Sequence, residues 1–241
     1  HLAAQVNVQR SLENPVETFD INVSGTLNLL ELCRSTRTRF ILVGTCLVYD
    51  LASAKKPINE QHPTLPRSPY AASKLSAEEI ALSYNHAYNL PVTILRPFNT
   101  YGPFQRSDME AGVVAIFMRK FLEGKTLQVF GNGTQTRDFL YVEDCADFIV
   151  RASFSDKAMG RILNAGSGRD ISIRDLALLI ARDSSRVEHV PHHHPKSEIP
   201  KLVCDYALAR RVLNWTPSTS PNEGLNRTEK WFRATAVETR P

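Results

Sequence analysis

Ser68-Pro-Tyr-Ala-Ala-Ser-Lys74 places a tyrosine and a lysine four residues apart at the start of a segment with a helical pattern. Residues four apart share one face of a helix. The Lys74 ammonium is therefore expected near the Tyr70 phenol, where its charge favours the phenolate and lowers a pKa of about 10. A phenol tuned in this way can act as a general base. The same short motif also occurs on solvent-facing amphipathic helices, so its chemistry depends on the surrounding sequence.

Apolar strands are predicted on both sides of this helix. Residues 40–44 (Phe-Ile-Leu-Val-Gly) form a short apolar run that ends at a glycine, which is typical of a buried strand. Thr45 follows at the carboxyl end of that run, and ligands bind at this end of the strands in open α/β sheets. Residues 91–96 predict a second strand, which leads into the polar loop 97–103.

The order of these elements resembles the extended short-chain dehydrogenase/reductase family, which contains nucleotide-sugar epimerases and dehydratases, and the resemblance spans nearly the whole chain. It implies an α/β fold with a Rossmann-type doubly wound parallel sheet and a smaller α/β substrate-binding domain. Residues 1–100 are expected to form the C-terminal part of the NAD-binding Rossmann domain. Residues 101–241 are expected to belong mainly to the substrate-binding domain, with segments at about 137–165 returning to the Rossmann domain.

The composition sets broad limits on the class of protein. A length of 241 residues allows one large domain or a domain with a small cap, and 42% hydrophobic and 22% charged residues fit a soluble enzyme. The sequence contains neither an apolar run long enough for a membrane span nor a signal-peptide pattern. The four cysteines lack disulfide-framework or metal-ligand spacing, so we expect reduced thiols, a cytoplasmic protein and no metal site. A net charge of +4 does not indicate a nucleic-acid surface.

The glycines form no GxGxxG or GxxGxxG loop, on which the pyrophosphate of a dinucleotide normally rests. If the resemblance holds, the N-terminal Rossmann strands are missing, because at least one βαβ unit of ~30 residues should precede His1. A non-catalytic fragment that binds a nucleotide sugar is therefore one alternative for this polypeptide.

The resemblance also extends to the N-terminal segment and the helix after it. Ala3 and Ala4 match the small residues that the family places against the cofactor. Residues 16–36 have apolar side chains at helical spacing, with Pro15 near the start, and predict a long helix. Asn22 within that helix matches the family asparagine that supports the active site, although a locally bonded polar residue would look the same.

The family resemblance assigns roles to five further residues. Tyr70 would take the proton from the sugar 4-hydroxyl as hydride passes to NAD, and Thr45 would orient that hydroxyl. Lys74 would lower the Tyr70 pKa and hold the nicotinamide ribose. Asn99 and Arg137 would bind the diphosphate of a nucleotide sugar, and arginine suits this task because its planar donors match phosphate oxygens.

The two residues after Thr45 separate the subfamilies. Dehydratases place Asp and Glu there, since elimination of water needs a carboxyl acid and a base, and decarboxylating relatives also keep an acidic residue. Here the positions hold Cys46 and Leu47. The sequence therefore favours a 4-epimerase, with a 4,6-dehydratase that uses unmatched acids as the alternative. Cys46 has no histidine near it in sequence to activate it as a nucleophile.

Later segments suggest supporting roles. Asp144 is expected to cap the helix that follows it, and Asn214 stands where the family usually has a glycine with positive φ. His192-His-His194 does not predict a metal site, although His194 or Lys196 could replace a second phosphate-binding arginine. The helices over residues 16–36 and 69–89 are candidates for a homodimer interface.

Overall fold

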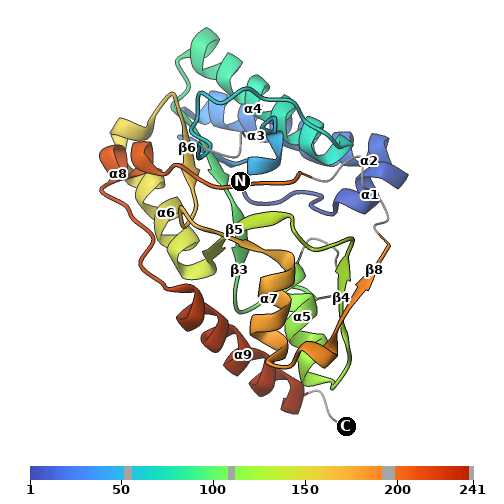
Figure 1. The fold of residues 1–241 in the computed structure, drawn as a ribbon. Helices are drawn as coiled ribbons and strands as arrows, with labels where there is room; N and C mark the ends of the chain where they lie inside the picture. Colours follow the sequence, from blue (N-terminus) through green and yellow to red (C-terminus); the bar gives the residue numbers. More distant parts are fainter. Residues whose placement is uncertain (52–55, 108–111, 192–198, 239–241) are drawn as a thin grey trace.

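The computed structural model of the chain describes residues 1–51, 56–107, 112–191 and 199–238 (Figure 1). The helices are α1 (Val8–Glu13), α2 (Pro15–Phe19), η1 (Asp20–Ser24), α3 (Gly25–Thr36), η2 (Cys46–Val48), α4 (Pro69–Tyr88), α5 (Val113–Leu122), α6 (Val142–Phe154), η3 (Asp156–Ala158), α7 (Ile173–Ala181), η4 (Ser184–Arg186), α8 (Ala207–Leu213) and α9 (Pro221–Glu238). The strands are β1 (Phe40–Val43), β2 (Val92–Pro97), β3 (Asn99–Tyr101), β4 (Leu127–Phe130), β5 (Thr136–Tyr141), β6 (Arg161–Ala165), β7 (Asp170–Ser172) and β8 (Val187–Val190).

A parallel sheet with the order β1-β2-β6 lies beside α3 and α4 (Figure 1). The register sets Phe40 opposite Val92 and Thr93 opposite Arg161. The central strand β2 is buried over nearly its whole length, as expected for a parallel strand covered on both faces. The backbone of His1 pairs with the other edge of β1, because its nitrogen donates to the Ile41 carbonyl oxygen (2.7 Å). The predicted α/β class with parallel strands is confirmed.

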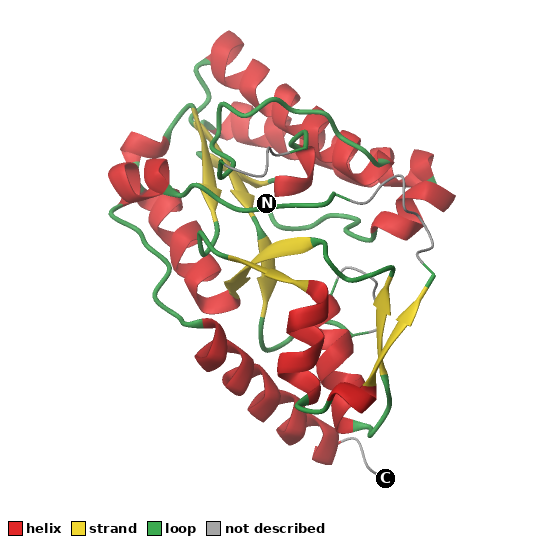
Figure 2. Ribbon diagram, viewed as in Figure 1, coloured by secondary structure: helices red, strands yellow, loops and turns green. Residues whose placement is uncertain are grey.

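Two further sheets, one of three strands and one of two, form the other half of the molecule (Figure 2). In one, β5 pairs in parallel with β3 and antiparallel with β7, and in the other β4 pairs in parallel with β8. Residues at about 137–165 are the segment expected to return to the Rossmann domain. Within it, β6 joins the β1-β2-β6 sheet, whereas β5 pairs with β3 and β7 in another sheet.

The helix predicted over residues 16–36 forms as α2, η1 and α3, with η1 a π-helical segment. Of the apolar positions that predicted the helix, Leu30 is fully buried, but the other buried positions are polar. The buried side chains recur every four residues as Thr18, Asn22, Thr26 and Leu30, whereas Val16 is 82% exposed. The helix therefore packs inward through three polar side chains together with Leu30, which belongs to an apolar cluster.

Helix α4 begins and ends with capping residues that the sequence supplies. The Ser68 side-chain oxygen accepts a hydrogen bond from the Ala71 nitrogen (3.2 Å), and Pro69 occupies the first turn. The helix ends at Asn89, which has a φ of 53°. Asn214 also ends its helix with a positive φ, of 50°, as predicted for a residue that replaces glycine.

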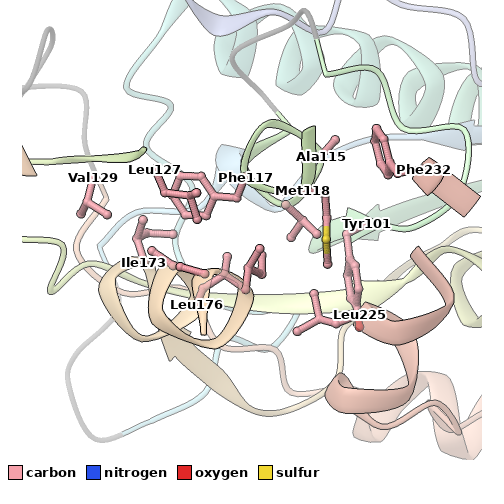
Figure 3. Packing of buried hydrophobic residues seen from close by; sticks show 14 of the residues in the cluster. Tyr101, Ala115, Phe117, Met118, Leu127, Val129, Ile173, Leu176, Leu225 and Phe232 are labelled. Atoms are coloured by element: carbon pink, nitrogen blue, oxygen red, sulfur yellow. The ribbon is translucent and has the colours of Figure 1, made fainter. Parts of the chain in front are cut away.

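The largest apolar cluster joins α5, α7, β4 and α9 (Figure 3). Phe117 and Met118 from α5 belong to this cluster together with Leu176 of α7 and Leu225 of α9. This cluster gives the half of the molecule beyond β3 a core of its own, and its α5 side faces the cavity described below. Across the described residues, every helix is too short or too polar to cross a bilayer.

Leu95→Ala in the buried centre of β2 is expected to lower the free energy of unfolding by about 2–5 kcal/mol, because it leaves a cavity in a packed core. The same change at Leu65, which is 51% exposed, should cost less than about 1 kcal/mol. Urea unfolding of both variants measures the difference. Equal losses would contradict the packing described for β2.

Candidate active site

A cavity of about 680 Å³ lies at the carboxyl ends of β1 and β2. Four residues singled out from the sequence line it, namely Thr45, Tyr70, Asn99 and Arg137. They come from four separate segments, so only the folded chain brings them to one place. The other lining residues are Val6, Val8, Gln9, Leu12, Gly44, Cys46, Leu47, Arg67, Ser68, Ala71, Pro97, Phe98, Thr100, Val113, Ile116, Phe117, Lys120, Gln128, Phe130, Gln135, Ile173 and Ile199.

The Tyr70 and Thr45 hydroxyls are hydrogen-bonded to each other at the edge of this cavity. Tyr70 stands in the first turn of α4, and Thr45 directly follows the residue after β1. Burial raises the pKa of the Tyr70 phenol to about 12, and the hydrogen bond with Thr45 opposes that shift. The expectation that Lys74 lowers the Tyr70 pKa is therefore wrong for the chain's own groups, because the cost of burying the phenolate outweighs its stabilisation.

Lys74 lies one helical turn after Tyr70 and is only 5% exposed. Its ammonium donates a hydrogen bond to the Val43 carbonyl oxygen at the end of β1 (2.7 Å). Burial lowers the pKa of Lys74 to about 8, and the negative charge of Glu78 opposes this change. Lys74 does not itself line the cavity but lies directly behind the two residues that do.

Asn22 connects the N-terminal segment to the first turns of α4. Its side-chain oxygen accepts from the Gln5 nitrogen (2.8 Å), and its amide nitrogen donates to the Gln5 carbonyl oxygen (3.0 Å). The same amide nitrogen donates to the Ser73 hydroxyl (2.9 Å), which in turn donates to the Tyr70 carbonyl oxygen (2.8 Å). Asn22, Ala3 and Ala4 do not line the cavity, and Ala3 is exposed.

Asn99 and Arg137 lie on the side of the cavity opposite α4, at β3 and β5. The buried side-chain oxygen of Asn99 has no hydrogen-bond partner within the described part of the chain. The Arg137 guanidinium donates to the carbonyl oxygens of Thr136 (2.8 Å) and Ile199 (2.6 Å), which hold it at the cavity wall.

Asp138 is an organising residue that the sequence reasoning missed. It is fully buried beside Arg137 and accepts hydrogen bonds from the Ser167 nitrogen and hydroxyl (both 2.6 Å), the Gly168 nitrogen (2.9 Å) and the Cys204 nitrogen (3.0 Å). These bonds fix two distant loops against β5. The sequence contains Asp138 in the Arg-Asp-Phe run at 137–139, but this run does not indicate that Ser167, Gly168 and Cys204 bind the carboxylate.

Asp144 differs from its expected role. It lies in the first turn of α6, but its carboxylate accepts from the nitrogens of Ser218 (3.2 Å) and Thr219 (2.9 Å) and from the Ser218 hydroxyl (2.7 Å). It therefore anchors the loop before α9 instead of capping its own helix. His192 to His194 and Lys196 lie outside the described residues.

The charged side chains at the cavity are all basic. Arg67, Lys120 and Arg137 line it, and the described lining residues include no aspartate or glutamate. Cys46 and Leu47, which stand where dehydratases have acids, both line the cavity. Burial raises the pKa of the Cys46 thiol to about 12, so it stays protonated at neutral pH. Arg67 and Lys120 were not predicted, because nothing in their sequence indicates which way they point.

Comparison with known proteins shows which family the chain belongs to. The model of the NAD dependent epimerase/dehydratase family matches residues 1–166. UDP-glucose 4-epimerase from Mycolicibacterium smegmatis is 36% identical over 236 residues, which cover 97% of this chain and 75% of the relative.

Solved structures agree with the sequence comparison. The X-ray structure of Pal from Bacillus thuringiensis is 50% identical, with a TM-score of 0.95, and the match covers 98% of this chain and 75% of that one. UDP-glucose 4-epimerase from Thermus thermophilus, in complex with NAD, is 32% identical with a TM-score of 0.89, over 97% of this chain and 76% of that one. The resemblance inferred from motif order is confirmed, and the chain belongs to the NAD dependent epimerase/dehydratase family.

Proposed function

We propose that this chain carries the catalytic site of an NAD-dependent nucleotide-sugar 4-epimerase. The observation that carries the proposal is the hydrogen-bonded Thr45–Tyr70 pair, placed on a cavity whose described lining includes no carboxylate. Exchange of configuration at a sugar carbon requires proton removal and return at one hydroxyl, for which one such pair is sufficient. Elimination of water would need further acids and bases, and the cavity offers none at Cys46 and Leu47.

The residues behind this pair suit the cofactor that the family implies. A buried ammonium and a phenol, at Lys74 and Tyr70, lie together at the carboxyl end of β1, where dinucleotides bind in parallel sheets. We propose that both hold the nicotinamide ribose and that Ala3, Ala4 and Asn22 lie on the cofactor side. NAD, when bound, supplies the acceptor and donor of a hydride.

In this proposal Tyr70 takes the proton from the sugar 4-hydroxyl and later returns it to the hydroxyl of opposite configuration. Thr45 orients the hydroxyl by donating to or accepting from it. Because burial holds the Tyr70 pKa at about 12, proton removal depends on the hydrogen bond with Thr45, which favours the phenolate.

The diphosphate of the substrate is assigned to Asn99 and Arg137. The cavity is basic, and the unpartnered Asn99 oxygen can accept a hydrogen bond from a sugar or ribose hydroxyl on the same ligand. We further propose that residues 1–100, with a return near β6, form the cofactor domain and that most of residues 101–241 form the substrate domain.

A homodimer is proposed through the helices at 15–36 and α4. The outer side of this helical run carries exposed apolar side chains, including Val16 and Leu32, and exposed apolar surface of this kind favours association. Pairing of two helices from each copy would bury it in a four-helix arrangement. A cytoplasmic location is proposed because all four cysteines are free thiols.

Product analysis tests the proposed reaction. The full-length protein, incubated with UDP-glucose and NAD, is expected to yield the 4-epimer by proton NMR. Accumulation of a 4-keto-6-deoxy sugar would instead support a dehydratase.

Tyr70→Phe should lower turnover by about 10²–10⁴-fold, since it removes the general base, while calorimetric binding of the nucleotide sugar persists. Unchanged turnover would remove Tyr70 from the mechanism.

Arg137→Ala is expected to raise the KM for the nucleotide sugar by about 10- to 100-fold with a smaller effect on kcat, because charged hydrogen bonds to the diphosphate are lost. Arg210→Ala, on the exposed side of α8, is the matched control and should leave KM unchanged. Steady-state kinetics on samples with equal thermal unfolding midpoints measure both. A normal KM in the Arg137 variant would argue against its phosphate role.

Val16→Glu is expected to convert the dimer to a monomer in sedimentation experiments, because it places a charge in the apolar interface. Val150→Glu provides the same change on the exposed face of α6 and should leave the sedimentation coefficient unaltered. A monomeric wild-type protein, or a dimer in both variants, would contradict this interface.

A further inference from the structure

Glu78 is a buried carboxylate that the mechanism above does not use. It lies on α4 one turn after Lys74 and is fully buried. Arg96 of β2 donates to one of its oxygens through both Nε (2.9 Å) and Nη2 (2.6 Å). The second oxygen, Oε1, has no hydrogen-bond partner within the described residues. A charge buried in this way is costly, and a partial set of partners calls for a further role.

The unpartnered oxygen points to the end of β1, where Lys74 also reaches. A Cβ at Gly44 would overlap Glu78 Oε1, so the absence of a side chain at Gly44 makes room for the carboxylate. The adjacent Val43 carbonyl oxygen accepts the hydrogen bond from Lys74. Two successive turns of α4 therefore place an ammonium at Val43, the last residue of β1, and a carboxylate at Gly44, directly before Thr45.

Arg96 also contacts the Tyr49 ring, and this second contact positions the guanidinium that binds the Glu78 carboxylate. The Arg96 guanidinium lies over the Tyr49 ring, 4.7 Å from its centroid. The Tyr49 hydroxyl donates to the Asn164 side-chain oxygen on β6 (2.7 Å). This series of contacts connects the Glu78 carboxylate to β2 and β6 of the parallel sheet.

Among the described groups near Lys74, Glu78 is the one whose negative charge raises the Lys74 pKa. Tyr70 on α4 is uncharged because of its high pKa, and Cys33 on α3 is uncharged for the same reason. Burial raises the pKa of the Glu78 carboxyl, whereas the positive charge of Arg96 and its hydrogen bonds lower that pKa. Burial opposes a charge on Lys74 and lowers the pKa of Lys74 to about 8, so the charge depends on Glu78.

We propose that Glu78, held by Arg96, is a positioning residue that keeps Lys74 in its ammonium form at the end of β1, behind the Thr45–Tyr70 pair. The consequence for catalysis rests on the proposed epimerase function, but the electrostatic effect on Lys74 does not. The two can therefore be tested separately.

The direct test is an NMR titration of the Lys74 side chain in the full chain labelled with ¹³C-lysine. The Lys74 Cε signal is identified by its loss in Lys74→Arg. In Glu78→Gln the Lys74 pKa is expected to fall by about one unit, because the nearest opposing charge is removed. Glu79→Gln removes the same charge from the exposed neighbour and should leave the Lys74 pKa close to that of the unchanged chain.

A folded Glu78→Gln protein with an unchanged Lys74 titration would overturn the proposal. Since Glu78→Gln leaves Arg96 buried without a negatively charged partner, the double variant Glu78→Gln/Arg96→Met, which buries no lone charge, is measured beside it. The same fall in the Lys74 pKa is expected in the double variant. If neither variant folds, the pair is structural and the positioning role is rejected.

Activity provides the second readout. Lys74 is charged below its pKa, so a lowered pKa means that the ammonium is lost at lower pH. The alkaline limb of the kcat/KM profile in Glu78→Gln should therefore move to lower pH by about one unit, while the Glu79→Gln profile should not move. A changed titration with an unmoved alkaline limb would support the electrostatic role of Glu78 and count against the function proposed for Lys74.

Discussion

The hydrogen bond from the Lys74 ammonium to the Val43 carbonyl oxygen fixes α4 against the carboxyl end of β1. Because residues four apart lie on one face of a helix, the same contact directs Tyr70 toward the residues that follow the strand. Thr45 meets Tyr70 there, and the cavity opens in front of both. The geometry of the site thus follows from one junction between a helix and a strand.

Buried polar side chains surround the contact between α4 and β1, although burying a polar group costs free energy unless it is hydrogen-bonded. Asn22 avoids the cost by bonding to Gln5 and Ser73, and Asp138 does so through backbone nitrogens of two distant loops. Each network joins segments that are far apart in sequence. Such satisfied networks hold a site in one geometry more firmly than apolar packing does, because a shifted partner leaves a buried group unbonded.

The charge distribution separates this site from those of relatives that eliminate water. All charged side chains on the described cavity wall are basic, and the positions after Thr45 hold a protonated thiol and a leucine. Proton transfer in the cavity is therefore left to hydroxyl groups. Behind the wall, the buried carboxylates of Glu78 and Asp138 accept hydrogen bonds from other protein groups.

The sequence by itself determined the helices and longer strands, since their apolar periodicity and caps are local signals, and motif order identified the family. It also identified Thr45, Tyr70, Asn99 and Arg137, all of which line one cavity. It did not reveal short strands such as β3 and β7, which have too few residues for a period to emerge. Only the tertiary structure decided that α2 and α3 pack largely through polar residues, which partners Asp138 and Asp144 bind, and that burial raises the Tyr70 pKa. Those properties depend on groups brought together from distant parts of the chain and on the exclusion of water between them, which local sequence does not encode.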